Sequence, residues 1–438
     1  MTLALSGLAL VATFMALVMT KRTTAVVGLV LVPVLFALLL GFGPDISSYV
    51  AAGVTKVAPT GVMLMFAILY FGIMIDAGLF RPLVTRIVGW AGTDPLKVTI
   101  GHTALVSIVA LDGDGTTTLM VTASALLPVY RRLGISPLIF GVIGGGCSTL
   151  MNMSPWGGPT ARIATALHVD PMNIFLPMLP TIAVGLAFMF GLAWYFGIRE
   201  RARIARDGLP DLAVATIANP LVPNLEVDEA SQRPKLIWFN TLLTVGLMTC
   251  VVLQLAPLLV LFLVGVVVAL LVNYPRMHDQ RARLLAHSGN VLSVAMMVFA
   301  AGAFTGILEG TGMITAMSNG IVSILPPEVG PALGPITAFI SVPGTFFLSN
   351  DAYYFGVLPI IADAASAYGI TPEEIGRAAL LGQPMHGLSP LVAAVYLKCV
   401  VLNIELADLQ RFALRYVSLL TIVIIAAALL TGVVPLIK

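Results

Sequence analysis

The stretch Leu111-Asp-Gly-Asp-Gly-Thr-Thr-Thr118 places two carboxylates, two glycines and three hydroxyls between two apolar arms. A related stretch, Leu348-Ser-Asn-Asp351, follows 237 residues later (348 − 111) and again interrupts an apolar segment. Two carboxylates with hydroxyls suit a cation, or a polyoxyanion bound beside a metal, because hard cations take oxygen ligands. A solvated turn between two spanning helices is the alternative, but unrelated turns need not correspond between the two halves of a chain.

The chain around these stretches is too apolar for a water-soluble protein. Its 438 residues are 58% hydrophobic and 10% charged, and the mean hydropathy is +1.00. A soluble domain carries about 25% charged residues, so these values predict a membrane protein in contact with the lipid bilayer. The net charge of +2 suggests no nucleic-acid partner. Because the sequence contains no HExxH or GxSxG motif, we expect a protein that is not an enzyme.

Spanning helices need about 20 largely apolar residues. Eight stretches meet this requirement: 2–19, 24–43, 59–80, 174–198, 236–254, 256–273, 289–313 and 411–436. Four more are apolar but interrupted by Gly, Pro or acidic residues: 98–130, 135–167, 333–365 and 375–403. The polar segment 199–235 is predicted to be a cytoplasmic linker between a first membrane repeat, 1–198, and a second, 236–438.

Four pairs of short matches relate the two halves in one order. Phe71–Asp76 resembles Phe304–Glu309 at an offset of 233 (309 − 76), and the two polar stretches above are offset by 237. Gly134-Ile-Ser-Pro137 matches Gly369-Ile-Thr-Pro372, and Ser154-Pro155 matches Ser389-Pro390, both at an offset of 235. Such a series is typical of an internal repeat.

The repeats predict an all-α polytopic membrane protein. If 98–130 and 333–365 are re-entrant hairpins, each half crosses the membrane five times. An odd number of crossings inverts the second repeat relative to the first. Each repeat then contains one re-entrant hairpin and one broken transmembrane helix, the latter at 135–167 and 375–403.

The basic residues test this topology, because loops rich in Lys and Arg stay cytoplasmic. Ten crossings place most of them on one side and leave Lys56, Arg377 and Lys438 on the other. We therefore expect both termini outside. The residues placed together are Lys21, Arg22, Arg81, Arg86, Lys97, Arg131, Arg132, Arg199, Arg201, Arg203, Arg206, Arg276, Arg281, Arg283, Arg411 and Arg415.

The two broken segments contain Ser154-Pro-Trp-Gly-Gly-Pro159 and Gly382-Gln-Pro-Met-His-Gly-Leu-Ser-Pro390. Proline removes a backbone donor and breaks a helix, and broken backbone at membrane depth is tolerated only where it is buried in protein or lines a cavity. The amino end of the following half-helix can then face an anion. Two simple proline kinks are the alternative interpretation.

The polar and glycine residues of these four interruptions are the candidate substrate- and ion-binding residues. Arg162 either pairs with a substrate carboxylate as a planar fork or binds a carboxylate of the protein. His386 either carries a coupling proton or forms a hydrogen bond in the core. For Asp76 and Glu309, equivalent across the repeats, a structural role is at least as plausible. The candidates are Asp112, Gly113, Asp114, Gly115, Thr116, Thr117, Thr118, Asn152, Ser154, Pro155, Gly157, Gly158, Thr160, Arg162, Ser349, Asn350, Asp351, Gln383, His386, Ser389 and Pro390.

Over essentially its whole length the sequence resembles the citrate–divalent-metal:proton symporter family (CitMHS) of the ion transporter superfamily. The resemblance is carried by residues 111–118, Pro155–Arg162, Ser349–Pro359, Gly382-Gln-Pro and Leu388–Leu391. It implies a bacterial inner-membrane importer that takes citrate as a complex with Mg²⁺, Ca²⁺ or a similar ion, driven by protons and working by alternating access. It also implies hairpin tips and broken helices that meet at the substrate site, a homodimer, and no permanently bound cofactor.

Chelation makes physical sense of such a substrate. Free citrate carries three carboxylates, and dehydrating that charge is costly, whereas the metal complex is compact and less charged. Asp112 and Asp114 could then contact the metal of the metal–citrate complex. The sequence leaves open a Na⁺-coupled symporter of a di- or tricarboxylate or other oxyanion within the same superfamily. A channel and an intramembrane enzyme are more distant alternatives.

Overall fold

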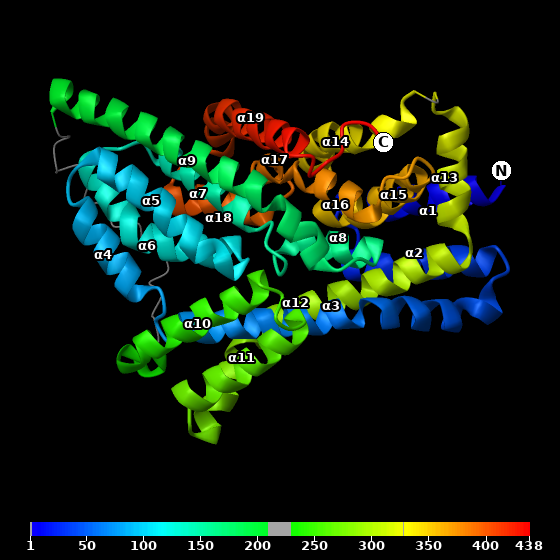
Figure 1. The fold of residues 1–438 in the computed structure, drawn as a ribbon, viewed down its shortest axis with the longest axis horizontal. Coiled ribbons are helices and arrows are strands. Elements are labelled where there is room, and N and C mark those ends of the chain that lie inside the picture. Colours follow the sequence, from blue (N-terminus) through cyan, green and yellow to red (C-terminus); the bar gives the residue numbers. More distant parts are fainter. Residues whose placement is uncertain (1, 209–228, 327) are drawn as a thin grey trace.

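The computed structural model describes residues 2–208, 229–326 and 328–438, and this part of the chain is helical with no strand (Figure 1). The first half comprises α1 (Thr2–Met19), α2 (Ala25–Leu39), α3 (Ile46–Asp76), α4 (Arg81–Ala91), α5 (Pro95–Val109), α6 (Gly115–Leu133), α7 (Pro137–Met151), α8 (Gly158–Leu167) and α9 (Pro171–Asp207). The second comprises α10 (Ile237–Val252), α11 (Leu258–Asn273), α12 (Met277–Gly310), α13 (Met313–Ile324), α14 (Leu333–Phe347), α15 (Leu358–Ser366), α16 (Pro372–Leu380), α17 (Gln383–His386), α18 (Ala393–Leu402) and α19 (Leu406–Leu430). Short helical turns join some of these helices: η1 (Gly43–Asp45), η2 (Ala110–Asp112), η4 (Glu229–Ser231), η5 (Pro234–Leu236), η6 (Gly330–Ala332) and the π-helical turn η7 (Ala352–Val357).

The second half repeats the order of elements of the first. α7, α8 and α9 begin 235 residues before α16, α18 and α19 (372 − 137, 393 − 158 and 406 − 171). The backbone repeats at special positions too, since Gly134 and Gly369 both have positive φ angles, 63° and 78°. The internal repeat is therefore visible in the succession of helices, whereas the inversion of one repeat relative to a membrane remains a prediction.

The interrupted segments have the predicted architecture. α5 and α6 form a helical hairpin that turns at Ala110–Asp114, and α14 and α15 form another that turns at 348–351. The first broken helix consists of α7 and α8, separated by 152–157, and the second of α16, α17 and α18, interrupted at 381–382 and 387–392. The prolines at 155, 159, 384 and 390 stand at or beside these breaks.

Six helical stretches are long and apolar enough to cross a membrane, and several shorter apolar helices accompany them. The protein is therefore a multi-pass membrane protein. The six stretches are Gly43–Asp76, Pro95–Asp112, Pro171–Asp207, Pro234–Val252, Met277–Gly310 and Leu406–Leu430.

Several helices extend beyond their predicted apolar limits. α3 begins at Ile46 rather than 59, and α12 at Met277 rather than 289, because polar residues near these ends are accommodated by ion pairs described below. The short helices α4 and α13, one in each half, were not expected. α9 continues to Asp207, eight residues past the predicted start of the linker at 199 (207 − 199), and residues 209–228 of that linker lie outside the described residues.

Paired signals in the sequence start several helices. Asp94-Pro95, Ser136-Pro137 and Asp170-Pro171 each place a capping side chain before a proline at the first helical position, and the cap accepts a hydrogen bond from the next amide but one. At Thr371-Pro372 the Thr371 hydroxyl accepts from the Glu374 amide and the Glu374 carboxylate accepts from the Thr371 amide, which completes a capping box. Proline has no amide to leave unsatisfied there, and its fixed φ angle suits the first turn.

Three hydrophobic cores hold the helices together, and they interlace the two halves of the chain. The central core joins α5–α9 with α14–α19 and contains Phe140 and Leu380. One flanking core packs α10 and α11 of the second half on α3 of the first. The other packs α1 and α2 of the first half on α12 of the second, where the rings of Phe14 and Phe304 lie 5.3 Å apart. Neither half packs as a separate unit.

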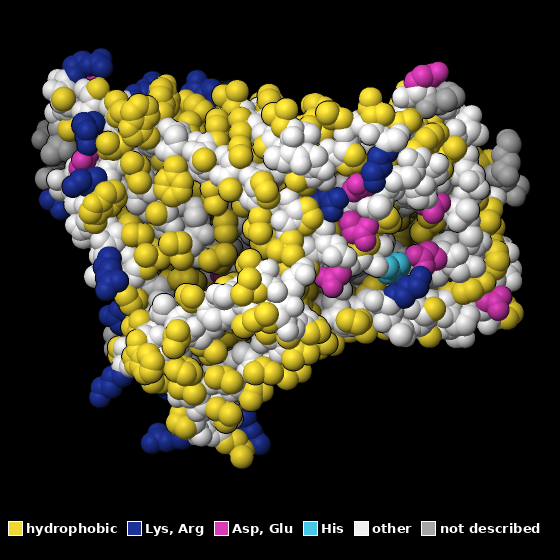
Figure 2. Space-filling model, viewed as in Figure 1, with side chains coloured by type: hydrophobic (Ala, Val, Ile, Leu, Met, Phe, Trp, Pro, Cys, Tyr) yellow, Lys and Arg dark blue, Asp and Glu magenta, His cyan; other side chains and the backbone are white. Residues whose placement is uncertain are grey.

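Charged side chains are unevenly distributed between the ends of the molecule. Figure 1 shows both chain termini at the same end, on the right of the view. Figure 2 shows Lys and Arg side chains gathered mainly at the opposite end, while most visible acidic side chains lie toward the end with the termini. This asymmetry agrees with the predicted distribution of basic residues. Which end faces the cytoplasm remains a prediction.

α3 and α12 lie side by side along much of their length, and glycines bring their backbones into contact (Figure 1). A Cβ atom added to Gly53 would lie 2.8 Å from the Cα of Gly306 and would clash with the carbonyl oxygen of Gly302. Small residues at this spacing allow helices in a membrane to approach closely and gain van der Waals contact.

Replacing Gly53 by Ala should therefore destabilise the protein. The added methyl meets backbone, which cannot rotate away, and overpacking of this kind costs about 1–3 kcal/mol. We expect a melting temperature several degrees lower for the purified protein in detergent. The matched control is Gly246→Ala on α10, where an added Cβ meets no atom within 4 Å. Equal melting temperatures for the two variants would contradict the close α3–α12 contact.

Candidate functional site

The tip of the first hairpin is folded around its two carboxylates. Oδ1 of Asp112 accepts a hydrogen bond from the Asp114 amide at 2.9 Å and one from the Thr118 hydroxyl at 3.4 Å. Asp114 is the N-cap of α6 and accepts from the Thr116 amide (2.9 Å) and the Thr117 hydroxyl (2.6 Å). Gly113 between them has a φ of 78°, a left-handed conformation that favours glycine.

Local hydrogen bonds thus fix the orientation of both carboxylates. In the described part of the chain, Oδ2 of Asp112 has no hydrogen-bond partner. Asp112 is buried, whereas Thr116 at the start of α6 is exposed. The tip can therefore present carboxylate oxygen to a ligand without unfolding its own turn.

The tip of the first hairpin packs against the break between α7 and α8. The indole nitrogen of Trp156 donates to the carbonyl oxygen of Leu111 at 2.7 Å. Gly113 lies so close that an added Cβ would be 3.3 Å from the Trp156 ring and 3.5 Å from the Cα of Gly157. The hairpin tip and the broken helix of the first repeat are therefore in direct contact, as the sequence predicted.

Side chains within the first break close its backbone on itself. Oδ1 of Asn152 accepts from the amide of Gly158, the first residue of α8, at 3.3 Å. The Thr160 hydroxyl donates to the carbonyl oxygen of Met153 at 2.9 Å. The buried Ser154 hydroxyl has no hydrogen-bond partner among the described residues, so it can bind a ligand or an ordered water.

The tip of the second hairpin meets the second break in the same way. Nε2 of Gln383 donates to Oδ1 of Asn350 at 3.1 Å and to the hydroxyl of Tyr354. The Ser349 hydroxyl accepts from the Ala352 amide at 3.1 Å and shapes the tip itself.

The second break also binds the end of α14. Nδ1 of His386 donates to the carbonyl oxygen of Thr345 at 2.7 Å, and the Ser389 hydroxyl donates to that of Phe346 at 2.7 Å. The Thr345 hydroxyl in turn donates to the carbonyl oxygen of Gly382 at 2.9 Å. His386 therefore has the structural hydrogen bond that was one of its two predicted roles, and its other ring nitrogen remains for a second partner.

Arg162 connects the two repeats. Its Nε lies 2.6 Å from Oδ1 of Asp351 at the second tip, and its Nη1 donates to the carbonyl oxygen of Gly158 at 3.1 Å. Both side chains are largely buried. Of the two roles left open by the sequence, this structure has Arg162 bound to a carboxylate of the protein.

α7 runs between the two tip-and-break assemblies and contacts both. A Cβ added to Gly115 would lie 3.5 Å from the Ser148 hydroxyl, and one added to Gly387 would lie 2.7 Å from Cγ2 of Thr149. Thr149 and Asn152 are three residues apart, so they lie on the same face of the helix. α7 therefore contacts the first hairpin beside its tip and the second break, and it leads directly into the first break.

Lys398 on α18, which the sequence predicted to extend to the cytoplasmic interface, was not among the candidate site residues. Its side chain is half-buried, its Nζ would be 2.9 Å from a Cβ added to Gly145 of α7, and it has no hydrogen bond or ion pair among the described residues. The signal available was the run Gly144-Gly145-Gly146, which leaves space beside α7 for a long side chain. Trp156, Thr345 and Tyr354 were also absent from the predicted set.

Most of the predicted residues thus fall into two assemblies. Residues 112–118 join 152–160 in the first, and 349–351 join Gln383, His386 and Ser389 in the second, with Arg162 between them. Pro390 is exposed and contributes its carbonyl oxygen to the Tyr396 hydroxyl at 2.8 Å. Within residues 2–208, 229–326 and 328–438, no cluster of three or more His, Cys, Asp or Glu side chains could hold a metal ion.

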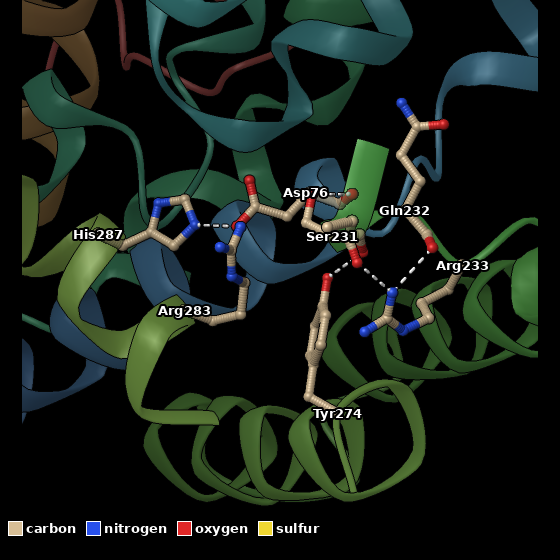
Figure 3. Close-up of polar contacts among 8 residues, drawn as sticks. Asp76, Ser231, Gln232, Arg233, Tyr274, Arg283 and His287 are labelled. Carbon is tan, nitrogen blue, oxygen red and sulfur yellow. Dashed lines mark hydrogen bonds and ion pairs between the residues drawn. The ribbon is translucent and has the colours of Figure 1, made fainter. Parts of the chain in front are cut away.

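Asp76 and Glu309 lie apart from these assemblies, at opposite ends of the α3–α12 pair. Oδ2 of Asp76 lies 2.8 Å from Nε2 of His287 and 3.2 Å from Nη1 of Arg283. Figure 3 shows this cluster together with Ser231, whose hydroxyl donates to the Asp76 carbonyl oxygen. The hydroxyl of Tyr274 donates to the Ser231 carbonyl oxygen at 2.8 Å. The cluster therefore anchors the chain that leads into α10.

Two hairpin tips that meet two broken helices, in repeated halves of a helical membrane protein, define a secondary transporter of the ion-transporter type. The family model for citrate transporters (CitMHS) matches residues 6–382. The chain belongs to this family.

Similar proteins agree with this assignment. The chain is 48% identical over 432 residues to a citrate transporter of Bacillus subtilis (strain 168), covering 99% of both chains. It is 46% identical over 435 residues, again 99% of both, to the Mg(2+)/citrate complex secondary transporter of the same organism.

Solved structures share the fold at low sequence identity. The Alcanivorax borkumensis YdaH transporter aligns with a TM-score of 0.57 and 14% identity, over 90% of this chain and 89% of its own. Neisseria gonorrhoeae MtrF, from a class of antimetabolite efflux pumps, aligns with a TM-score of 0.60 and 14% identity, over 89% and 84%. The fold of this chain is therefore shared with these two transporters.

The Arg162–Asp351 pair should contribute a measurable coupling energy. Arg162→Gln and Asp351→Asn should each lower the melting temperature because each leaves a largely buried charge unpaired, and the double variant should lose less than the sum. Residues in one such pair show interaction energies of about 0.5–3 kcal/mol. The control cycle is Arg201→Gln with Asp94→Asn, a more exposed pair expected to couple weakly. Additive losses at Arg162 and Asp351 would contradict the pairing.

Proposed function

We propose that the protein imports citrate as a complex with a divalent metal, Mg²⁺ or Ca²⁺, by proton-coupled alternating access. The observation that carries the proposal is the composition of the site. An acidic tip, Asp112 to Asp114, lies directly against a break rich in hydrogen-bond donors at the start of α8. A metal ion binds oxygen acceptors, whereas a carboxylate binds hydrogen-bond donors. Here the acidic tip and the donors of the break lie in direct contact. The Mg(2+)/citrate transporter of Bacillus subtilis, similar over the whole length, supports the same substrate.

The charge of the substrate favours the complex. Citrate with three ionised carboxylates would meet two acids at the first tip, and dehydrating it is costly. A divalent ion reduces the charge of the substrate by two, and the metal then faces the tip carboxylates. The metal is cargo in this proposal, with most of its ligands supplied by citrate and water.

The donors for the citrate oxygens come from the breaks. The amino end of α8 and the Ser154 hydroxyl are candidates in the described part of the chain. In α8 the Gly158 amide already donates to Asn152 and Pro159 has no amide, so this helix end offers an anion the Thr160 amide and the positive end of the helix dipole.

His386 uses its Nδ1–H on the Thr345 carbonyl oxygen, so its Nε2 donates to a citrate oxygen only when the ring is protonated. Arg162 can bind citrate only if the substrate displaces it from Asp351. Breaking this pair could therefore accompany the closure of the site around the ligand.

Protons supply the driving force in this proposal. A substrate that travels with enough protons to carry net positive charge gains about 2.3 kcal/mol per charge for each 100 mV of inside-negative potential. The proposed setting is the inner membrane of a bacterium, with both termini outside and two copies of the chain forming a homodimer.

Uptake into proteoliposomes tests the proposal. Labelled citrate is supplied without metal or with Mg²⁺, Ca²⁺ or Fe³⁺, and each condition is combined with an imposed pH gradient or Na⁺ gradient. We expect accumulation only when a chelating metal and an inward proton gradient are both present. Uptake of metal-free citrate, or of a dicarboxylate, driven by Na⁺ would overturn the proposed substrate and coupling ion and favour an oxyanion symporter instead.

Asparagine variants of the first tip test the role of its carboxylates. Asp112→Asn and Asp114→Asn remove the negative charge, yet an amide oxygen can still accept the local turn and cap hydrogen bonds. A hydrogen bond to a charged group is worth about 1.5–3 kcal/mol, so we expect the apparent affinity for metal–citrate to fall roughly tenfold or more. The KM for uptake with Mg²⁺ measures this.

Alanine at position 114 separates charge from folding. Asp114→Ala also removes the N-cap of α6, which costs about 1 kcal/mol of stability, so its melting temperature should fall while that of Asp114→Asn stays close to wild type. Unchanged uptake in the double variant Asp112→Asn/Asp114→Asn would remove both carboxylates from the mechanism.

A further inference from the structure

At each end of the α3–α12 pair, one acidic residue lies beside a histidine and a second cation. The two acidic residues occupy equivalent positions in the two repeats. Asp76, near the C-terminal end of α3, binds His287 and Arg283 of α12. Glu309, near the C-terminal end of α12, binds Lys56 of α3 at 2.6 Å and lies 3.1 Å from Nε2 of His168. These clusters are separate from the substrate site described above.

The two clusters connect different parts of the molecule. His287 and Arg283 both belong to α12, so the Asp76 cluster joins only the two long helices. His168 directly follows α8, the second half of the first broken helix, which carries Gly158 and Arg162 of the substrate site. The contact of His168 with Glu309 therefore joins the site-bearing body to the long-helix pair.

His168 stands in an unusual and well-defined position. It is the C-cap of α8 with a left-handed φ of 54°, and its side chain is only 13% exposed. Neither ring nitrogen forms a hydrogen bond among the described residues, although Nε2 lies within ion-pair distance of Glu309. Histidine is one of the non-glycine residues that are enriched at left-handed positions, so the turn accepts it, while the two unbonded ring nitrogens leave it able to bind a proton or water.

A cavity lies beside this histidine. Its volume is about 260 Å³, and its polar lining includes Lys56, Thr60, His168 and Asp170. Figure 2 shows the corresponding hollow near the end with the chain termini, where histidine, acidic and basic side chains meet. Water, and therefore protons, can reach this cluster from that end of the molecule.

The second repeat provides an internal comparison. The position equivalent to His168 is Asn403 (403 − 168 = 235), the C-cap of α18, with nearly the same φ of 55°. Asparagine adopts this conformation readily and does not change its charge with pH. α18 packs on α6, α7 and α19, whereas α8 packs on both α3 and α12. The repeats therefore differ in sequence and in contact at the same backbone position.

We propose that His168 and Glu309 form a binding site for the coupling proton, and that protonation holds the first broken helix against α12. This inference rests on the proposed proton-coupled transport and assigns a location to its proton. The site opens to the end of the protein that carries both termini, which the charge distribution predicts to be outside, where an inward proton gradient supplies protons.

The direction of the effect follows from the charges. Histidine changes its charge between about pH 5 and 8. Imidazolium and carboxylate form an ion pair, so the contact between α8 and α12 is stronger with a proton bound to the His168–Glu309 pair and weaker without it. Glu309 then stays paired with Lys56 alone. The contact is thus sensitive to the proton concentration on its own side.

Of the other charged groups on the elements that pack on α8, Asp363 of α15 and Glu373 of α16 have no side-chain partner among the described residues. Several others are bound elsewhere. Asp170, at the start of α9, caps that helix by accepting from the Met172 amide at 2.8 Å. Arg162 on α8 binds Asp351 of the second tip. On α16, which also packs on α8, Glu374 binds Lys438, and Arg377 binds the carbonyl oxygens of Val433 and Asn173. Among the described residues, Glu309 is the charged group within ion-pair distance of His168, and Lys56 binds the other oxygen of the same carboxylate.

His168→Asn tests the inference with the residue that the second repeat uses, so the left-handed turn is kept. His278→Asn is the matched control, because the His278 side chain is 94% exposed. Citrate uptake with Mg²⁺ is measured in proteoliposomes at external pH values from about 6 to 8. We expect wild type and His278→Asn to slow severalfold across this range, and His168→Asn to be slow and nearly independent of pH.

Thermal unfolding gives a readout that needs no transport. The melting temperature of wild type should exceed that of His168→Asn by more at pH 6 than at pH 8, and Glu309→Gln should show the same pattern. His168→Asn with wild-type pH dependence in both measurements would overturn the inference, as would loss of the uptake profile in His287→Asn instead. Wild-type protein that takes up no citrate would refute the proposed function, while the unfolding measurement would still test the proton site.

Discussion

Backbone that leaves the helix inside an apolar protein has no water to hydrogen-bond with, and this constraint organises the whole site. Four interruptions are needed to bring polar groups to the middle of the molecule, and each must find partners within the protein. Trp156 binds the Leu111 carbonyl oxygen, Thr345 binds that of Gly382, and Ser389 binds that of Phe346. Each tip is thus completed by the break of its own repeat. The protein therefore needs these contacts between hairpin tip and broken helix in order to fold, whatever part they play in transport.

The sequence alone predicted the parts of this arrangement that have a local signature. Matched offsets revealed the repeat, and glycines, prolines and acidic residues inside apolar stretches located the hairpins, the breaks and the candidate site residues. It could not predict the partner of Arg162, because Asp351 is 189 residues away and no short-range pattern connects them. Nor could it place Lys398 beside Gly145, since an apolar helix with one lysine is equally compatible with a side chain that reaches the membrane surface.

The three cores suggest which parts move together. Glycines lock α3 to α12 by direct backbone contact, and each of these helices carries a pair of helices from the other half, so the long-helix pair and its two flanks form one framework. The central core gathers both hairpins and both broken helices with α9 and α19. Candidate site residues from both repeats therefore belong to one body, and the contact of His168 with Glu309 joins this body to the framework.

The contact of Gly53 with Gly302 and Gly306 also has a consequence for synthesis. The two sides of this contact are about 250 residues apart in the chain (302 − 53 = 249). At usual rates of translation the first side must wait for roughly 10–50 s before the second emerges. During this time α3 is in the membrane without its partner, and α1 and α2 lack the helix on which they pack. The nascent first half therefore has to persist as an incomplete structure, and a chain interrupted after α9 would expose the glycine surface of α3 to lipid or to other proteins.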